Sequence, residues 1–379
     1  MQDSERSYEG SHVILVMSVA SPWSVDIAIG MRAQGVSLEV VTRMYPYDYE
    51  ADSILREGTE RLASNNITVT WPRKWMAKLP SALSMALHLR VRSQTIIKRN
   101  RSIHVLCLYG GMQAIAAWLS GIRPYSVFWV GSDLLLQGAA RRPIIRRLST
   151  SARYNFVNGL HMVSVGMHRF GLTTLRNHYI GINTKYWMSE GPRDPNLAIC
   201  TRWFEPVYGN EVVIEAAGLL HAQGTDIKFQ FTSSGKQLNE CQTLANQLAP
   251  ERVNFLGGVS RDILHSALSA ASIYVSMSRS DGTSTALLEA MAMGLFPILS
   301  DIPANREWIC NHGCDGILVP VNDVVALAKA LDVILNSPTR VRESRAHNRA
   351  IVEMLADGRH NLTNLAEMLF TKTTKDNAK

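Results

Sequence analysis

The 379-residue sequence has few cysteines, and their spacing does not indicate a disulfide framework. The five are Cys107, Cys200, Cys241, Cys310 and Cys314. An odd number of scattered cysteines is typical of a protein in a reducing compartment. Cys310, His312 and Cys314 have no second Cys/His pair at a useful distance, which favours a surface loop over a zinc site.

Several other signatures are missing as well. The first dozen residues lack the basic segment of a signal peptide, and the apolar run at residues 13–17 is too short to span a membrane. We therefore expect a cytoplasmic protein. The sequence has no Gly-Lys-Ser/Thr phosphate loop, which argues against an ATPase. It also has no zinc finger, RNP or helix-turn-helix pattern, so nucleic-acid binding is disfavoured.

Acidic residues are nearly absent from one long stretch. Between Arg61 and Lys185 the chain carries 18 Lys or Arg and a single acid, Asp133, which gives 18 − 1 = +17. The net charge of the whole chain is +7, so the remainder carries −10. Such asymmetry indicates an anionic partner for the first half.

Two tryptophans, Trp71 and Trp75, lie among the basic residues of segment 71–79, and the basic segment 83–101 follows, a combination found in helices that lie on membrane surfaces. We expect this face to dock peripherally on the inner, cytoplasmic face of an anionic cell membrane. A solvated basic face is the alternative.

Apolar strand patterns alternate with helical patterns in both halves of the chain. In the first half we expect strands at residues 13–17, 38–42, 105–108, 126–130 and 161–164, and a helix at 26–34. In the second half we expect them at 197–201, 228–232, 253–256, 273–278, 296–300 and 316–319, each followed by a helix. Continuous apolar strands that alternate with helices predict an α/β fold with parallel sheets.

Turn-forming residues gather at 189–195 and indicate a linker. The chain is also long enough for two domains. We therefore expect Rossmann-like domains at residues 1–188 and 189–379, with the last helix free to pack back on the first domain.

The segment at residues 278–294 carries the clearest chemical signal. It follows a predicted strand and enters an apolar helix through a Gly-Thr-Ser-Thr turn. The free backbone N–H groups and the dipole of that helix suit a diphosphate. Asp281 is expected at the end of the strand, and Glu289 lies one turn beyond Thr285, so the two carboxylates can reach different parts of one ligand.

Asp281 and Glu289 stand eight positions apart, and their segment resembles the acid-x7-acid signature of retaining GT-B glycosyltransferases of family 4. The likeness extends over residues 253–259, 294–307 and 316–320. The GT-B plan has two Rossmann-like domains that face each other across a cleft. The N-terminal domain receives the acceptor, and the C-terminal domain binds the nucleotide-sugar donor.

The resemblance implies that the chain is a retaining hexosyltransferase. It would move a sugar from a UDP- or GDP-sugar to a glycan or glycolipid acceptor, such as a lipid-linked or cell-surface polysaccharide precursor. Glu289 would hold the ribose hydroxyls, and Asp281 would hold hydroxyls of the transferred sugar. The amides of Gly282, Thr283 and Ser284 would lie near the sugar and the diphosphate.

The sequence has no Asp-x-Asp pair, the usual metal-chelating signature of the other glycosyltransferase fold, so we expect neither a metal nor another cofactor. Fixed cations must then stabilise the negative charge of the departing diphosphate. Arg202 matches the arginine that follows the first strand of the donor domain in the resembling family. Tyr208 stands near the position expected for a lysine, and its phenol is neutral at pH 7. This difference keeps open a non-catalytic GT-B binding or scaffold subunit. A nucleotide-sugar 2-epimerase is a further alternative.

Asp133 ends the segment at residues 128–133, which is similar to the Trp-Gly-Ser-Asp turn of some family 4 enzymes. Ligand sites in open α/β sheets collect at the carboxyl ends of strands, where this segment is expected. We expect Asp133 to orient or deprotonate the acceptor hydroxyl. A structural Asp turn or helix cap is the alternative.

Overall fold

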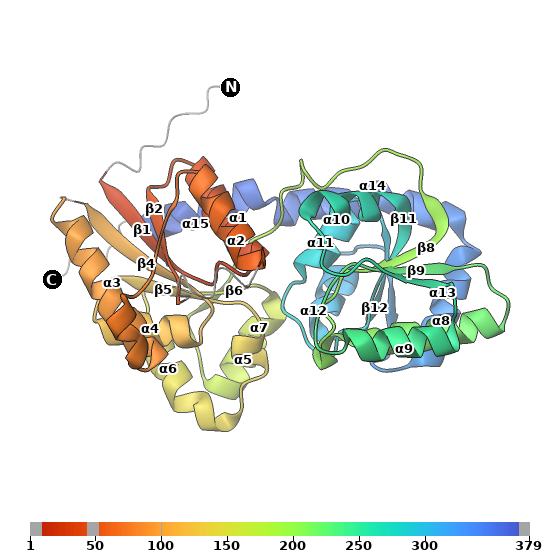
Figure 1. Cartoon of the computed structure of the whole chain (residues 1–379), viewed down its shortest axis with the longest axis horizontal. Coiled ribbons are helices and arrows are strands. Elements are labelled where there is room, and N and C mark those ends of the chain that lie inside the picture. Colours follow the sequence, from red (N-terminus) through yellow and green to blue (C-terminus); the bar gives the residue numbers. More distant parts are fainter. Residues whose placement is uncertain (1–9, 44–52, 100, 371–379) are drawn as a thin grey trace. The chain divides into compact units, whose positions relative to one another are not determined.

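The computed structural model describes residues 10–43, 53–99 and 101–370 (Figure 1). These residues form two compact units. The first comprises the described residues up to Ile180 together with Gly358–Phe370, and the second comprises Gly181–Asp357. The chain therefore crosses between the units at 180–181 and again at 357–358.

The first crossing lies before the position that the turn formers at 189–195 predict. Residues 181–188 are tied to the end of α14 (Pro338–Ala356). Ile182 donates its backbone N–H to Ala356, and the Thr184 hydroxyl lies 2.5 Å from Asp357 Oδ2. Residues 189–193 lead into the first strand of the second sheet, which already includes Asp194 and Pro195.

Within the described part of the first unit, seven parallel strands pair in the order β3-β2-β1-β4-β5-β6-β7. The strands are β1 (Ser11–Val16), β2 (Leu38–Val41), β3 (Thr68–Thr70), β4 (Ser102–Leu108), β5 (Tyr125–Trp129), β6 (Asn155–Val157) and β7 (Leu175–Asn177). Val13 pairs with Leu38 on one side and His104 on the other. Residues 13–16 of β1 are apolar and buried on both faces, as a parallel sheet covered by helices requires.

Helices cover both faces of this sheet (Figure 1). They are α1 (Pro22–Ala33), α2 (Ser53–Ser64), α3 (Ser81–Ile97), α4 (Met112–Ser120), α5 (Ser132–Leu135), α6 (Arg142–Ser151), α7 (Leu160–Val165) and α15 (Gly358–Phe370), with short helical turns at η2 (Lys74–Lys78), η3 (Ala139–Arg141) and η4 (Gly166–Phe170). The last helix, α15, packs on α1, and Leu362 and Leu365 join the core of this unit. The approach is close, because a Cβ at Gly30 would lie 2.3 Å from Leu362 Cδ1.

The second unit has six parallel strands in the order β10-β9-β8-β11-β12-β13. They are β8 (Asp194–Cys200), β9 (Lys228–Phe231), β10 (Val253–Phe255), β11 (Ala271–Ser276), β12 (Phe296–Ser300) and β13 (Ile317–Val319). The helical segments are η5 (Pro206–Tyr208), α8 (Asn210–Ala222), α9 (Leu238–Leu248), α10 (Arg261–Ala270), α11 (Thr285–Ala292), α12 (Pro303–Arg306), η6 (Glu307–Asn311), α13 (Val324–Leu335) and α14.

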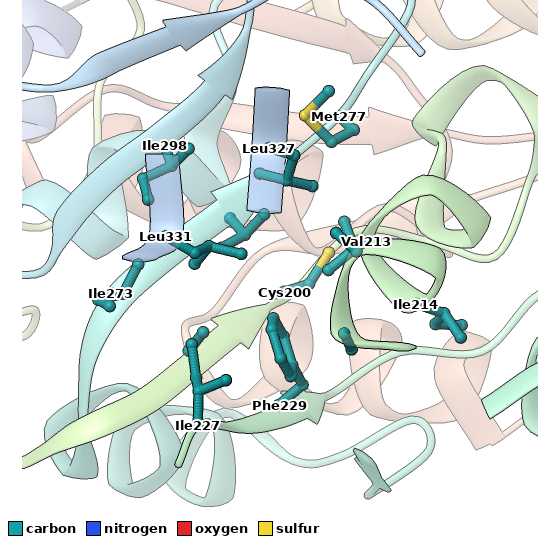
Figure 2. Packing of buried hydrophobic residues seen from close by; sticks show 14 of the residues in the cluster. Cys200, Val213, Ile214, Ile227, Phe229, Ile273, Met277, Ile298, Leu327 and Leu331 are labelled. Carbon is teal, nitrogen blue, oxygen red and sulfur yellow. The ribbon is translucent and has the colours of Figure 1, made fainter. Parts of the chain in front are cut away.

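The core of the second unit lies between its sheet and the neighbouring helices α8 and α13. Figure 2 shows Leu327 and Leu331 of α13 beside Ile273 and Ile298 of the sheet. Val213 of α8 belongs to the same buried cluster. This rigid packing holds the carboxyl ends of β8 and β11 in place, and those ends lead into the candidate site described below.

The α/β prediction is confirmed in both units, but one predicted strand is wrong. Residues 161–164 form part of α7, whose Met162 alone is fully buried within that segment. The strand lies earlier, at β6, and the backbone N–H of Gly159 donates to Asn177 Oδ1 at the break between strand and helix. The three-residue strands β3, β6 and β7 are not among the predicted strands, whereas β10 and β13, of the same length, are.

None of the helices in the described ranges combines the length and hydropathy needed to cross a membrane.

Candidate functional site

The turn between β8 and α8 fixes the backbone around Arg202. Asn210, the first residue of α8, donates its side-chain amide to the carbonyls of Arg202 at 3.3 Å and Trp203 at 3.0 Å. Gly209 has φ +62°, and a Cβ there would lie 2.4 Å from the carbonyl oxygen of Met277. Only glycine fits this close approach, so the turn lies directly against the chain that leaves β11.

The guanidinium of Arg202 joins two predicted site residues. Its Nη2 lies 2.7 Å from Asp281 Oδ2, and its Nη1 donates to the Ser284 hydroxyl at 2.6 Å. Ser284 is the N-cap of α11 and accepts from the backbone N–H of Leu287 at 3.3 Å. The structure therefore places a cation and a carboxylate together at the positive end of this helix.

Arg202 is a permanent cation in this position. Burial by itself lowers its pKa, but the negative charge of Asp281, with smaller contributions from Tyr274 and Tyr208, outweighs burial and raises the pKa. Its Nε is buried and has no hydrogen-bond partner among the residues described. The N–H groups and dipole at the start of α11, together with the guanidinium that Asp281 holds in place, suit an anion.

Tyr208 supports Arg202 instead of replacing the expected lysine. The Arg202 Cζ lies 4.2 Å from the centre of the Tyr208 ring, which is a cation–π contact. Tyr208 ends η5, so the short helical turn after β8 carries the aromatic surface on which the guanidinium rests. A phenol in this role orients the arginine but adds no positive charge.

Arg279 was missed from the sequence, although it lies within the segment that carries the signature. Its backbone N–H donates to the carbonyl of Val207 at 2.7 Å, and its Nε donates to Asn322 Oδ1 at 2.9 Å. The same guanidinium contacts the carbonyl of Pro206 and the carboxylate of Glu211. Arg279 thus ties the η5 turn to the loop that carries Asp281.

The remaining predicted donor residues lie on or just before α11. Asp281 is in the loop between β11 and α11, not at the end of the strand as expected, because β11 ends at Ser276. Gly282, Thr283 and Ser284 are buried in that loop. Glu289 is half-buried and lies four residues after Thr285, about one turn along the helix.

Asp133 belongs to the first unit and binds its own backbone. Its two carboxylate oxygens accept hydrogen bonds from the N–H groups of Gly110 at 2.6 Å, Gly131 at 2.8 Å and Val130 at 3.0 Å. Burial raises its pKa, and these hydrogen bonds partly offset that effect. The side chain therefore joins the loops after β4 and β5, a geometry that favours the structural alternative.

The basic segments around η2 and α3 expose apolar as well as charged side chains. Trp75 is 60% exposed, and Val91 and Ile97 of α3 are also exposed. Arg92 is not part of this surface, because it forms a two-point ion pair with the buried Glu39, with Nε to Oε1 at 3.0 Å. The exposed cations next to the apolar residues are Arg73, Lys78, Arg90, Lys98 and Arg99.

Among the residues described, no three His, Cys, Asp or Glu side chains lie close enough to hold a metal ion. Cys310 is exposed and Cys314 is buried. The expectation of a metal-free site stays a prediction.

Comparison with known proteins gives the site its family context. Residues 186–351 match the profile of the family described as Glycosyl transferases group 1. A GDP-mannose:cellobiosyl-diphosphopolyprenol alpha-mannosyltransferase of Xanthomonas campestris is 28% identical over 160 residues, which are 41% of this chain and 41% of that protein. The chain thus matches less than half the length of this curated relative.

Two solved structures resemble nearly the whole chain. A glycosyltransferase from Rickettsia africae aligns with a TM-score of 0.76 and 14% identity, over 96% of this chain and 98% of that one. The Anabaena protein HepE, solved with UDP and glucose, aligns with a TM-score of 0.73 and 15% identity, over 95% and 99%. The GT-B fold is therefore confirmed, and residues 186–351, which hold Arg202, Asp281 and Glu289, match the profile of the glycosyl transferases group 1 family.

Proposed function

We propose that this protein is a retaining glycosyltransferase that moves a hexosyl unit from a nucleoside-diphosphate sugar to an acceptor hydroxyl. The observation that carries the proposal is the position of Arg202 at the N-terminus of α11, where its guanidinium donates hydrogen bonds to Asp281 and Ser284. A buried permanent cation at a helix N-terminus is suited to the charge that develops on a departing diphosphate.

Each donor residue then has a distinct task. The loop amides of Gly282, Thr283 and Ser284 and the first turn of α11 bind the diphosphate, with Arg202 beside them. Glu289, about one turn along the helix, binds the ribose hydroxyls. Asp281 binds hydroxyls of the transferred sugar while it keeps Arg202 oriented.

In the proposed reaction the bond between the anomeric carbon and the diphosphate oxygen breaks as the acceptor oxygen forms its bond on the same face of the sugar. The acceptor proton passes to the departing phosphate, so no covalent protein intermediate is required. Because Arg202 and the helix supply positive charge, we expect transfer to continue in the presence of EDTA.

For the acceptor we propose a lipid-linked glycan at an anionic membrane surface. The curated relative is named for a diphosphopolyprenol acceptor, and the exposed Trp75, Ile97 and nearby cations suit a membrane interface. Asp133 is the proposed residue for orienting or deprotonating the acceptor hydroxyl. This proposal rests on its position just after β5, since ligands of open α/β sheets collect at the carboxyl ends of strands. Its backbone hydrogen bonds favour the structural alternative, and the turnover of Asp133→Asn decides between the two roles.

A thermal-shift screen of UDP-, GDP- and ADP-sugars tests donor binding. A ligand at 100 times its Kd stabilises the folded state by about 2.7 kcal/mol, so a specific donor should raise the melting temperature clearly. Glu289→Ala should remove the shift, whereas Glu343→Ala, an exposed glutamate of α14, should retain it. Absence of a shift with every donor, or an unchanged shift in Glu289→Ala, would refute the donor assignment.

Sugar transfer needs an assay separate from donor binding. Tyr208 stands near the position expected for a lysine, and its ring contacts the Arg202 guanidinium but adds no positive charge for the leaving diphosphate. This observation supports the alternative of a GT-B subunit that binds donors without transferring sugar. NMR analysis of the product from a stabilising donor distinguishes the cases: a product with the donor's anomeric configuration supports retention. Binding without product supports the non-catalytic subunit, and a sugar nucleotide inverted at C2 supports an epimerase.

A further inference from the structure

A cavity of about 180 Å³ lies within the second unit, away from the donor residues. Its lining comes from the segment before β8, the C-terminal end of α11, and α14. Helix α11 begins next to Arg202 and runs back to the start of β12, so the cavity lies at the opposite end of the helix. Eight helical residues span about 12 Å, so this cavity is separate from the donor site.

Three arginines line this cavity, and two of them have structural partners. Arg193 donates to the carbonyls of Leu268 at 3.0 Å and Ala271 at 2.8 Å, and also contacts that of Met293. Arg349 donates to the carbonyl of Ala292 at 2.6 Å, and Glu353 balances its charge in an ion pair at 2.6 Å. These two side chains therefore satisfy carbonyl groups at the C-terminal ends of α10 and α11.

Arg345 differs from the other two arginines. Within the described ranges it has no hydrogen-bond or ion-pair partner, and its Nε is buried. Its aliphatic part lies beside Gly294, where an added Cβ would be 3.4 Å from Arg345 Cγ. A buried guanidinium nitrogen without a partner is costly, because an arginine normally donates through all of its N–H groups.

The charges around the cavity are also unbalanced. Burial and then the positive charge of Arg345 lower the pKa of Arg193 to about 10. Glu190 is the only acid in the lining, and it is exposed and forms no ion pair with any described residue. An anion between Arg193 and Arg345 would reduce their mutual repulsion and provide an acceptor for Arg345.

We propose that this cavity binds a small phosphate-bearing anion, with Arg345 as its main ligand and Arg193 as a second positive charge. A guanidinium matches a phosphate group because its planar N–H fork donates two parallel hydrogen bonds. The cavity has room for about six water molecules at their volume in the liquid, which is enough for a phosphoryl group.

Isothermal titration with inorganic phosphate and with pyrophosphate, at constant ionic strength, tests the site. Arg345→Gln should weaken binding at least about tenfold, the usual effect of losing a charge-assisted hydrogen bond. Arg342→Gln, an exposed arginine on the same helix, should bind as the wild type does. Arg345→Lys keeps the charge but loses the fork, and should bind with intermediate affinity.

Arg202→Gln distinguishes this cavity from the start of α11, which also suits phosphate. Binding that is lost in Arg345→Gln and kept in Arg202→Gln supports the proposal. Binding that is lost only in Arg202→Gln, or that is the same in all variants, overturns it, as does the absence of binding to the wild type.

The stability of the ligand-free protein provides a second measurement. Without phosphate, Arg345→Gln should unfold at the same temperature as the wild type or higher, because one of two repelling charges is gone. A lower unfolding temperature with unchanged phosphate affinity would show that Arg345 has a structural role only, and would overturn the proposal.

Discussion

Arg202 Nη2 and Asp281 Oδ2 lie 2.7 Å apart, so the cation at the start of α11 is held by a carboxylate that we also assign to the transferred sugar. Both side chains are mostly buried, at 10% and 20% exposure. Each charge therefore depends on the other, and loss of one partner leaves a buried charge without compensation.

We predict that Arg202→Met lowers the free energy of unfolding by about 3 kcal/mol, as for other broken buried ion pairs. It should lower the rate of sugar transfer at least about 100-fold, because a donor to the developing charge is lost. Urea unfolding and turnover assays measure the two effects. The double variant Arg202→Met/Asp281→Asn should recover stability but not transfer. Normal turnover in Arg202→Met would show that this arginine does not stabilise the leaving group.

Gly209→Ala should destabilise the second unit by more than about 2 kcal/mol, since it adds both a left-handed backbone penalty and a contact 2.4 Å from the Met277 carbonyl. Gly224→Ala is the matched control. Gly224 has φ +76° with no atom near its Cβ position, so only the backbone penalty of about 1 kcal/mol applies. Equal losses in urea unfolding for the two variants would contradict the close approach at Gly209.

Asp133→Asn should destabilise the first unit by about 2 kcal/mol. One carboxylate oxygen that now accepts a hydrogen bond from a backbone N–H becomes an amide nitrogen, which cannot accept it. Turnover of the folded fraction separates the two roles of this residue. If Asp133 is the base, its raised pKa means that it becomes protonated, as the pH is lowered, at a higher pH than an ordinary aspartate does. The activity of the wild type should fall at that pH, and Asp133→Asn should show no such fall. Near-normal turnover in folded Asp133→Asn would remove the catalytic role.

Three histidines of the first unit, of which His88 and His104 are buried and His178 is half-buried, predict a loss of stability in acid. Burial lowers the pKa of His104 to about 3 and those of His88 and His178 to about 4, from the ordinary value of 6.5. Below pH 6.5 the unfolded chain binds protons that the folded chain does not, so stability falls as pH falls. Each histidine contributes up to about 1.4 kcal/mol per pH unit until its folded pKa is reached.

Chemical unfolding at pH 7 and pH 5 measures this dependence. His104→Gln should show a shallower loss of stability between the two pH values than the wild type. Identical losses would mean that His104 takes up a proton while folded, contrary to its burial beside Ser126, whose hydroxyl lies 2.9 Å from Nε2.

The membrane proposal predicts that the protein co-sediments with vesicles rich in anionic lipid and less with neutral ones. Trp75→Ala should reduce this binding roughly tenfold, because a large apolar side chain no longer enters the interface. Met354→Ala removes a side chain that is 69% exposed on the second unit and should leave binding unchanged. Binding that is independent of anionic lipid would contradict a docking face.

Much of the fold follows from local patterns. β12 was predicted to the residue at 296–300, because its continuous apolar run is bounded by Gly294 on one side and by a polar turn on the other. The errors fall where local patterns are short or ambiguous. Residues 161–164 contain apolar side chains that suit a strand or a helix, and only packing against the sheet selects the helix.

The sequence by itself determined the two parallel α/β sheets and the place of the donor segment, because strand periodicity, helix caps and turn residues act over a few positions. Only the tertiary structure decided which distant side chains meet. Arg202 contacts Asp281 and Ser284 from 79 and 82 positions away, and Arg92 pairs with Glu39 although it lies in a basic stretch. The cluster of Arg193, Arg345 and Arg349 likewise arises only when the segment before β8 and helix α14 pack around one end of α11. Such pairings depend on the whole packed unit, because a side chain's partners are set by the helices and strands that pack beside it, not by its neighbours in sequence.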